Sequence, residues 1–500
     1  MTALYAATAE PTELRQRSPK WLLPTLFGIA LVVYGAFAWR PIFWVDEYLT
    51  QAAIARPWSD LFEWITTRDP ALGPYYIVMK IWSLASVSPF WMRLPSVVAM
   101  ASAVVVVTVL VCRLADMRIA YLAAAAMLLL PNISRYAQEN RPYAFALLCT
   151  VAAAALWQWS LEKDRPRWWA VGYGAAVAAM GLAHLYTVTL VPALVVAALA
   201  GPGDQRKSAF WRTVVPAAVA LVVISPHIYL NLAHPTGSPI EGPLTLSSLM
   251  HLVRVTMPYE LAAALGAISM LGVIALARRP EYRPLWVLGL AWTIIPPLLL
   301  LSAKIAVDLP VIRVRYLVFV MPGLAMLAAL GLRRIAAISA PLLVAVLVVM
   351  TILGLPRQID IRSLDGHNRD QPLAPLLRAA AQSGMPIIAA NRSAVRLVNA
   401  ATYPQNLLAE PVNPATVKYV AVVERTRFAN TVPADFLYYQ AHGPWRQIAK
   451  CRVSQALVRI FENDKLMTGS LGSPEEIGKR LSAATEDAVL CKVVTGPTQK

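Results

Sequence analysis

Charged residues are scarce in this chain. Of its 500 residues, 15% are Asp, Glu, Lys or Arg, whereas 58% are hydrophobic. This excludes a soluble protein of one or two packed cores, which would carry far more charge, and places the chain in the polytopic membrane class. Acidic residues are scarcer than basic ones, with 28 Asp and Glu against 45 Lys and Arg.

The excess of basic residues could suggest nucleic acid, but its distribution argues against that partner. The basic residues form short clusters between apolar runs, for example at Arg113, Arg206 and Arg333. Such spacing is typical of the cytoplasmic loops of membrane proteins. We therefore expect membrane lipids, and no nucleic acid, to be the partner of most of this charge.

Cysteines are few and show no metal-ligand spacing. Cys112 and Cys149 lie in apolar runs, whereas Cys451 and Cys491 share a polar tail. If that tail is extracytoplasmic, the second two could form a disulfide; two unpaired thiols are the alternative. The chain also lacks a glycine-rich phosphate loop in its tail and any internal repeat.

Long apolar runs are abundant and predict a polytopic α-helical membrane protein of about eleven transmembrane helices. With the basic clusters taken as cytoplasmic, an odd count leaves the N-terminus inside and the C-terminus outside. Ala36-Phe37-Ala38 resembles a signal cleavage site, but the long first run favours an uncleaved anchor. The expected spans are residues 21–39, 91–112, 119–133, 142–160, 167–182, 185–202, 213–231, 258–277, 284–302, 314–332 and 335–355.

Composition predicts three parts: a cytoplasmic tail at 1–20, a transmembrane domain at 21–355 and a small extracytoplasmic α/β domain at 356–500. Within the transmembrane domain, the long first external loop at 40–90 alternates charges with aromatic residues, which favours amphipathic helices along the membrane surface. In the tail, strand-like runs at 386–390 and 418–423 alternate with helix-like stretches at 373–382 and 394–401.

Two carboxylates, Asp46 and Glu47, follow the first span. Flanking Trp44 and Tyr48 suggest a position at the membrane face, exposed to both water and lipid. There a carboxylate could act as a general base toward an acceptor hydroxyl or amine. The alternative is that Asp46 only begins a surface loop.

A second cluster lies between the third and fourth spans. Gln138, Glu139 and Arg141 bring an amide, a carboxylate and a guanidinium to one turn, followed by Tyr143. Ionisable groups this close to lipid are costly and are retained for pairing or function. The structural alternative is an ion pair of Arg141 with Glu139 or Asp46 that holds helices together.

Two further groups fall on the same external side. His184-Leu185-Tyr186 lies between two expected spans, where the histidine is a candidate ligand or a hydrogen-bonded helix contact. Lys304, Arg313 and Arg315, with Tyr316, place cations outside, against the usual charge rule. Such a group suits a phosphate or diphosphate, and ordinary anionic phospholipid is the alternative.

These groups together suggest a reaction. A lipid phosphate neutralised by external cations is a good leaving group, and a carboxylate opposite it can activate an acceptor. Aromatic residues such as Tyr75 and Tyr76 offer platforms for sugar rings. Sugar transfer from a polyprenyl phosphate fits, whereas nucleotide sugars would be on the cytoplasmic side.

The order of several motifs resembles a known family. The motifs are Trp44-Val45-Asp46-Glu47, then Asp69-Pro70 leading to Pro74-Tyr75-Tyr76, then Arg93-Leu94-Pro95-Ser96. This order is similar to that of the bacterial branch of glycosyltransferase family 39. These are protein mannosyltransferase and aminoarabinose transferase relatives of the C-type (GT-C) superfamily. Residues 136–143 look like the family's S-Q-E-x-R-x-Y turn. Arg315-Tyr316-Leu317, together with Pro322, looks like the family's late R-Y-L…P span. The resemblance covers roughly residues 20–355.

The resemblance implies inverting transfer of a hexose or pentose from a polyprenyl-phosphate donor, outside a bacterial plasma (inner) membrane. Asp46 would be the catalytic base and Glu47 its support, and Glu139 and Arg141 would shape the pocket. Some relatives need a divalent cation, so Mg²⁺ or Mn²⁺ could be held by Asp46, Glu139 and His184. Where the family often has His-Pro-Pro, this chain has Ala71-Leu72-Gly73-Pro74.

The identities of the sugar and acceptor stay open: mannose, arabinofuranose or aminoarabinose, and a glycan, lipid or protein acceptor. Two other classes compete, a transporter or flippase of a lipid-linked saccharide and a non-catalytic envelope-assembly partner. A transporter predicts charges at mid-membrane depth and broken helices in repeated halves. This sequence instead concentrates its ionisable groups at one face and shows no repetition.

Overall fold

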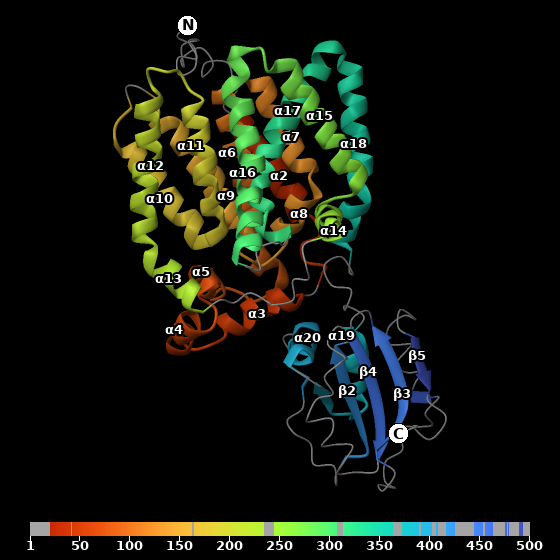
Figure 1. Cartoon of the computed structure of the whole chain (residues 1–500). Helices are drawn as coiled ribbons and strands as arrows, with labels where there is room; N and C mark the ends of the chain where they lie inside the picture. Colours follow the sequence, from red (N-terminus) through yellow and green to blue (C-terminus); the bar gives the residue numbers. More distant parts are fainter. Residues whose placement is uncertain are drawn as a thin grey trace. The chain divides into compact units, whose positions relative to one another are not determined.

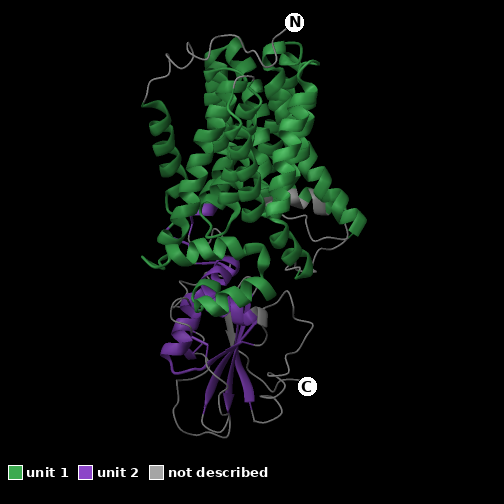
Figure 2. Cartoon of the chain, turned by 90° about the vertical axis from the view of Figure 1, so that its left-hand side faces the viewer, with its two compact units in different colours: residues 1–38, 53–359 green, residues 39–52, 360–500 purple. Residues whose placement is uncertain are grey.

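The computed structural model falls into two compact units, coloured in Figure 2. Residues 1–38 and 53–359 form the helical unit, and residues 39–52 and 360–500 form the C-terminal unit. The composition change predicts a boundary near residue 356, but it does not predict that residues 39–52 fold with the tail. The described residues are 21–41, 43–162, 165–234, 245–307, 314–363, 373–389, 392–402, 407–408, 417–425, 445–453, 456–463, 476–477, 479 and 490–493.

The helical unit is a bundle of helices (Figure 1). Its helices are α2 (Leu22–Gly35), α4 (Trp58–Thr67), α5 (Gly73–Trp82), α6 (Pro89–Leu114), α7 (Met117–Leu129), α8 (Pro131–Ala137), α9 (Tyr143–Ser160), α10 (Trp168–Ala183), α11 (Leu190–Leu199), α12 (Arg206–Val223), α13 (Ser225–Ala233), α14 (Leu246–Thr256), α15 (Tyr259–Leu276), α16 (Arg283–Val307), α17 (Met321–Ile338) and α18 (Ala340–Arg362). Single turns are η1 (Pro70–Leu72), η2 (Leu185–Thr189), η3 (Pro280–Tyr282), η4 (Val314–Tyr316) and η5 (Val318–Val320).

Each of the eleven expected spans coincides with a helix or helix pair, but the count of eleven is not confirmed. Within the described residues, six helices are long and apolar enough to cross a membrane, or eight if each bent pair is one span. The pairs are α7–α8, bent by 67°, and α12–α13, bent by 58°. Shorter apolar helices cover the other three positions: α2, α10 and η2–α11.

The bend between α7 and α8 follows from a proline. Pro131 opens α8, and the residue before it, Leu130, has an extended backbone with ψ of 112°. A proline disfavours helical geometry in the preceding residue and lacks the N–H that would continue the ladder. The chain therefore turns here and brings residues 138–141 to the end of the bundle.

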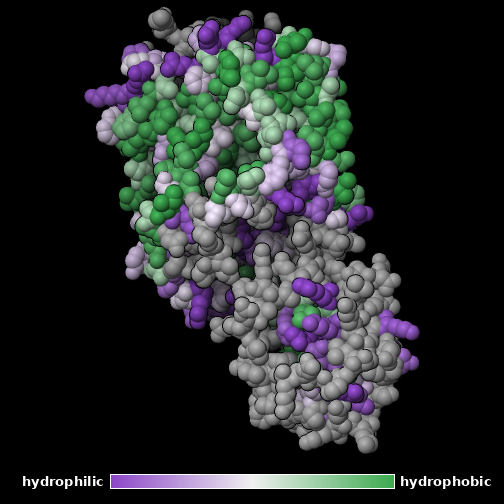
Figure 3. Space-filling model, turned by 45° about the vertical axis from the view of Figure 1, so that its right-hand side comes forward, coloured by the Kyte–Doolittle hydropathy of each residue, from purple (hydrophilic) through white to green (hydrophobic). Residues whose placement is uncertain are grey.

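The outer helices present apolar stripes. Val344, Val348 and Ile352, one turn apart on α18, are at least half exposed, and apolar residues cover much of the side of this unit in Figure 3. Bare apolar stripes of this kind are costly in water but suited to lipid. The helical unit is therefore a membrane-embedded body.

Close glycine contacts join α15, α16 and α17. A Cβ placed on Gly331 of α17 would overlap the carbonyl oxygen of Ile268, and one on Gly272 of α15 would overlap the backbone of Gly331. Gly289 and Gly323 approach each other similarly between α16 and α17. Small residues at helix crossings let backbones pack closely, as is common in membranes.

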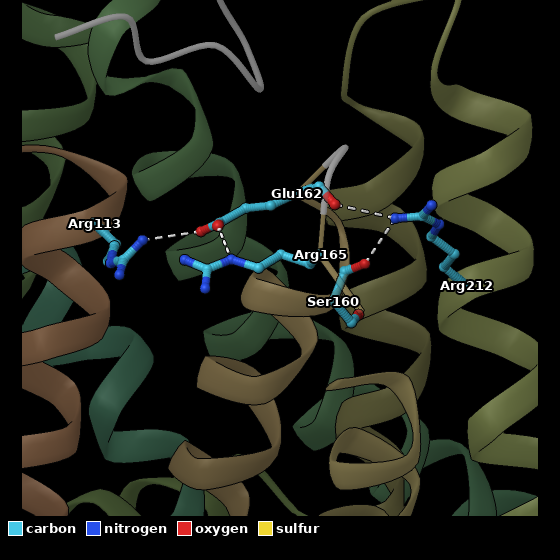
Figure 4. Close-up of polar contacts among 5 residues, drawn as sticks. All are labelled: Arg113, Ser160, Glu162, Arg165 and Arg212. Carbon is cyan, nitrogen blue, oxygen red and sulfur yellow. Dashed lines mark hydrogen bonds and ion pairs between the residues drawn. The ribbon is translucent and has the colours of Figure 1, made fainter. Parts of the chain in front are cut away.

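Basic residues gather where α6, α9 and α12 meet. Glu162 accepts hydrogen bonds from Arg113, with Nη1 to Oε1 at 3.0 Å, and from Arg165 (Figure 4). Arg212 donates to the carbonyl oxygens of Ser160, at 2.9 Å, and of Glu162, at 3.2 Å. These bonds show that the end of α6, the end of α9 and the start of α12 share one face, named here the basic face.

The C-terminal unit contains a five-stranded sheet of order β1-β2-β4-β3-β5. β1 and β2 are parallel and the other pairs are antiparallel. The helices of this unit bury one side in a shared core with the sheet. Its elements are β1 (Ile387–Ala389), β2 (Tyr419–Arg425), β3 (Trp445–Val453), β4 (Ala456–Asn463), β5 (Leu490–Val493), α19 (Leu373–Gln382), α20 (Arg392–Thr402) and most of α3 (Val45–Ile54).

The helical unit holds free cysteines and the C-terminal unit a disulfide-bonded one. Cys112 and Cys149 are free thiols in the helical unit. Cys451 on β3 is disulfide-bonded, and the register of β5 sets Cys491 opposite it. The side chain of Cys491 lies outside the described part of the chain.

Candidate active site

The two acids beyond the first span occupy the first turn of α3. Glu47 is buried, and its Oε2 accepts a hydrogen bond from the backbone N–H of Trp44 at 3.3 Å. This is the reach of a third-position glutamate back to the helix start, which satisfies a backbone donor. Glu47 therefore helps to cap α3, whereas Asp46 is half-buried in a turn whose helix dipole favours a carboxylate.

Residues 138–141 form a buried polar turn between α8 and α9. Gln138, Glu139 and Asn140 have no exposed surface, and Arg141 is buried as well. The amide Nε2 of Gln138 donates to the carbonyl oxygens of Tyr34 and Ala36, both at 2.8 Å. Gln138 thus ties the turn to the end of α2.

Tyr75 and Tyr76 fasten α5 around this turn. The hydroxyl of Tyr75 donates to Oδ1 of Asn140 at 2.8 Å, and that of Tyr76 to Oδ2 of Asp69 at 2.6 Å. Tyr76 is also hydrogen-bonded to Arg141, and burial, aided by the Asp69 carboxylate, raises the pKa of its phenol well above the usual value. Both rings, expected as sugar platforms, are buried at 5% and 1% exposure.

Glu139 forms an ion pair that sequence reasoning missed. Its Oε1 lies 3.1 Å from Nε of Arg135 on α8, with side-chain exposures of 0% and 18%. The four-residue spacing of Arg135 and Glu139 was the available signal, since residues so spaced share a helix face. Removing one partner of a buried pair leaves an uncompensated charge, so the two residues act together.

His184 lies among aromatic rings from three other segments. Its ring centroid is 5.9 Å from that of Tyr143, 5.2 Å from Tyr186 and 5.0 Å from Tyr316. The rings of Tyr186 and Tyr316 also meet, at 5.1 Å. These contacts bring together the start of α9, the end of α10, η2 and η4, which lie at the helix ends away from the basic face.

Two guanidinium groups, those of Arg315 and Arg141, lie near this aromatic cluster. The guanidinium of Arg315 lies over the ring of Tyr316, 5.4 Å from its centroid. Burial, followed by the charges of Arg315 and Arg141, lowers the pKa of His184, in the turn between α10 and η2, to about 3. Lys304 is half-buried in the last turn of α16, and Arg313 lies outside the described residues. Of the three expected cations, Arg315 and Lys304 are thus among the described residues.

No metal centre emerges from the described residues. Among them, no three His, Cys, Asp or Glu side chains gather as a metal ion would require. Of the three expected ligands, Asp46 lies in the first turn of α3, Glu139 pairs with Arg135 and His184 packs among rings. Ala71, at the position of the family histidine, lies in η1.

A family model matches part of the chain. Residues 69–230 match the family described as dolichyl-phosphate-mannose-protein mannosyltransferase. The matched segment includes Tyr76, the 138–141 turn and His184. No curated protein sequence shows significant similarity to the chain.

Solved structures share the fold. ArnT from Cupriavidus metallidurans in the apo state superposes with a TM-score of 0.56 at 16% identity, covering 88% of this chain and 97% of ArnT. The same protein bound to undecaprenyl phosphate gives 0.54, also at 16% identity, covering 88% and 98%. Archaeal oligosaccharyltransferase AglB from Archaeoglobus fulgidus, in complex with an inhibitory peptide and a dolichol-phosphate, gives 0.50 at 11% identity, covering 94% and 77%. Residues 69–230 thus match this mannosyltransferase family, and most of the chain shares the fold of ArnT and AglB.

Proposed function

We propose that the chain transfers a sugar from a polyprenyl-phosphate donor to an acceptor outside the cytoplasm, with inversion at the anomeric carbon. One observation carries the proposal. Arg141, His184 and Arg315 interact electrostatically around one partly buried aromatic cluster, at helix ends away from the basic face. Cations beside aromatic rings suit a ligand with both a phosphate and a sugar.

The donor's phosphate is the part that cations recognise. ArnT has been solved with undecaprenyl phosphate and AglB with a dolichol-phosphate, which supports a polyprenyl-phosphate donor here. Arg315, Lys304 and Arg313 would hold the phosphate and offset its charge as the sugar leaves. Neutral His184 would contribute a hydrogen bond rather than a charge.

In the proposed reaction, Asp46 is the general base. Its carboxylate takes the proton from the acceptor hydroxyl or amine while the acceptor atom bonds to the anomeric carbon, on the face opposite the phosphate. The bond from that carbon to the phosphate oxygen breaks, and the electron pair leaves with the polyprenyl phosphate. Glu47, engaged with the backbone of Trp44, would hold the helix turn that carries the base.

The proposed side is extracytoplasmic, in a bacterial inner membrane. Support comes from the basic face, because cytoplasmic loops carry excess Arg and Lys, and the aromatic cluster lies at the opposite helix ends. The disulfide of Cys451 also favours an oxidising compartment for the C-terminal unit.

The test of the base is Asp46→Asn, which is nearly isosteric. Purified variants receive undecaprenyl-phosphate-linked mannose, arabinofuranose or aminoarabinose, with envelope extract from a deletion strain as acceptor, and released undecaprenyl phosphate is measured. We expect a loss of roughly 10²- to 10⁴-fold in turnover with unchanged affinity for undecaprenyl phosphate. Asp60→Asn, an exposed acid on α4, is the matched control. Normal turnover in Asp46→Asn would remove the assignment.

The test of the phosphate site is Arg315→Ala. Hydrogen bonds to charged groups contribute about 1.5–3 kcal/mol, so undecaprenyl phosphate should bind roughly 10-fold more weakly or worse. Arg334→Ala, an exposed cation near the end of α17, should bind as the wild type does. Equal affinities for all three proteins would refute the role of Arg315.

A further inference from the structure

The helix that carries the candidate base is anchored on the C-terminal unit. Val45 packs against the hydrophobic core that α19, α20 and the sheet share. The side chain of Tyr48 is hydrogen-bonded to that of Asn399 on α20. Both contacts lie inside one compact unit, formed by residues 39–52 and 360–500. Asp46 lies between the two anchors in the sequence.

Helix geometry separates the anchors from the acid. Residues three apart share a helix face, so Val45 and Tyr48 present one face of α3 to the C-terminal unit. Asp46 follows Val45 by a rotation of about 100°, which turns its carboxylate away from that face. The anchors can therefore set where Asp46 lies without occupying the space around it.

The anchor itself is firmly packed. Leu397, Val398 and Ala401, around Asn399 on α20, are buried in the core of the C-terminal unit. By contrast α3 has ten residues, and a helix this short is marginal on its own in water. The position of α3 therefore depends on what it docks against.

We propose that Tyr48 and Asn399 are positioning residues, through which the C-terminal unit holds the first turn of α3 and sets the place of the Asp46 carboxylate. The inference rests on the proposed role of Asp46 as base. Neither residue touches the reacting atoms, so the expected loss is in kcat rather than in donor binding.

The experiment compares Tyr48→Phe, Asn399→Ala and the double variant in the full-length protein. A single hydrogen bond is worth about 0.5–1.5 kcal/mol, so kcat should fall about 3- to 10-fold in each single variant and no further in the double. The KM for the donor should not change. Arg396→Ala, an exposed position on the same helix, is the matched control and should keep wild-type kcat.

A second readout needs no substrate. Hydrogen–deuterium exchange of the amides of residues 46–52 should be roughly 3- to 10-fold faster in Tyr48→Phe and Asn399→Ala, and unchanged in Arg396→Ala. A general loss of structure would speed exchange in the whole C-terminal unit, including β3 and β4. If Asn399→Ala does not fold, Tyr48→Phe, which removes one oxygen atom, decides the question.

The outcomes separate this inference from the proposed function. Wild-type kcat and exchange in Tyr48→Phe would overturn the positioning role, and so would additive losses in the double variant. If Asp46→Asn is inactive while Tyr48→Phe is normal, only the positioning role fails. If Asp46→Asn keeps its turnover, the base assignment fails and the positioning role fails with it.

Discussion

At His184, three tyrosine rings and two guanidinium groups decide the state of the imidazole. Burial and the charges of Arg315 and Arg141 lower its pKa to about 3, far below the 6.5 of a free side chain. The ring is therefore neutral near pH 7. A histidine usually titrates near neutrality, and the sequence alone could not show that this one does not.

The stability of the protein should therefore fall in acid partly through His184. As the pH drops below 6.5, His184 becomes protonated in the unfolded state, whereas in the folded state it stays neutral until about pH 3. Stability is lost over that window, by up to about 1.4 kcal/mol per pH unit. The unfolding temperature of the wild type should drop more between pH 7 and pH 5 than that of His184→Gln. His234→Gln, an exposed histidine, should follow the wild type, and parallel curves for all three would contradict the prediction.

The sequence proposes candidate site residues where a charged side chain lies close to an apolar run. Glu139, Arg141 and Arg315 were selected in this way. Arg135 was missed because it adjoins an expected span and its partnership with Glu139 depends on a short helix, α8. The burial of Tyr75 and Tyr76 was likewise unpredictable, because it depends on Asn140 and Asp69 lying against α5.

At the scale of helices and strands, apolar runs predict the positions of these elements well and their lengths less well. The expected helix at 373–382 matches α19 and the strand-like run at 418–423 lies mostly within β2, because local patterning dominates in such segments. The bends at Pro131 and near Pro226 shorten straight segments. A hydropathy run reports apolar character but not the angle between successive helices.

The glycines at the crossing of α15 and α17 yield a prediction at this scale. Gly331→Ala forces a Cβ into the carbonyl of Ile268, so we expect a cost of about 1–3 kcal/mol or more from overpacking. Gly266→Ala on α15 meets nothing within 4 Å and should be neutral or slightly stabilising. Thermal unfolding in detergent measures both. Equal unfolding temperatures for the two variants would refute the close crossing.

For the whole molecule, the two units differ in surface, core and cysteine chemistry. The helical unit has exposed apolar stripes and two free thiols, whereas the C-terminal unit has a sheet and a disulfide-bonded Cys451. A disulfide persists in an oxidising compartment. The C-terminal unit should therefore lie outside the cytoplasm.

Thiol counting tests this expectation. Denatured protein from cells lysed under alkylating conditions should react with a mass-tagged maleimide at Cys112 and Cys149 alone, and Cys451 should react after reduction. Cys451→Ser should lower the unfolding free energy by about 2–4 kcal/mol. An alkaline phosphatase fusion at the C-terminus should be active. Labelling of Cys451 without reductant, or an inactive fusion, would contradict the assignment.

The sequence by itself determined the membrane class, the approximate helix positions and the family resemblance. These follow from hydropathy, charge distribution and local motifs, which are properties of neighbouring residues. Only the tertiary structure decided that the Arg135–Glu139 ion pair is buried, that the rings of Tyr143 and Tyr316 pack against His184, and that residues 39–52 fold with the tail. The surroundings of His184 and the docking of residues 39–52 depend on packing between segments far apart in the chain, which no local pattern encodes. The burial of the Arg135–Glu139 pair depends on the bend that sets α8 into the protein interior.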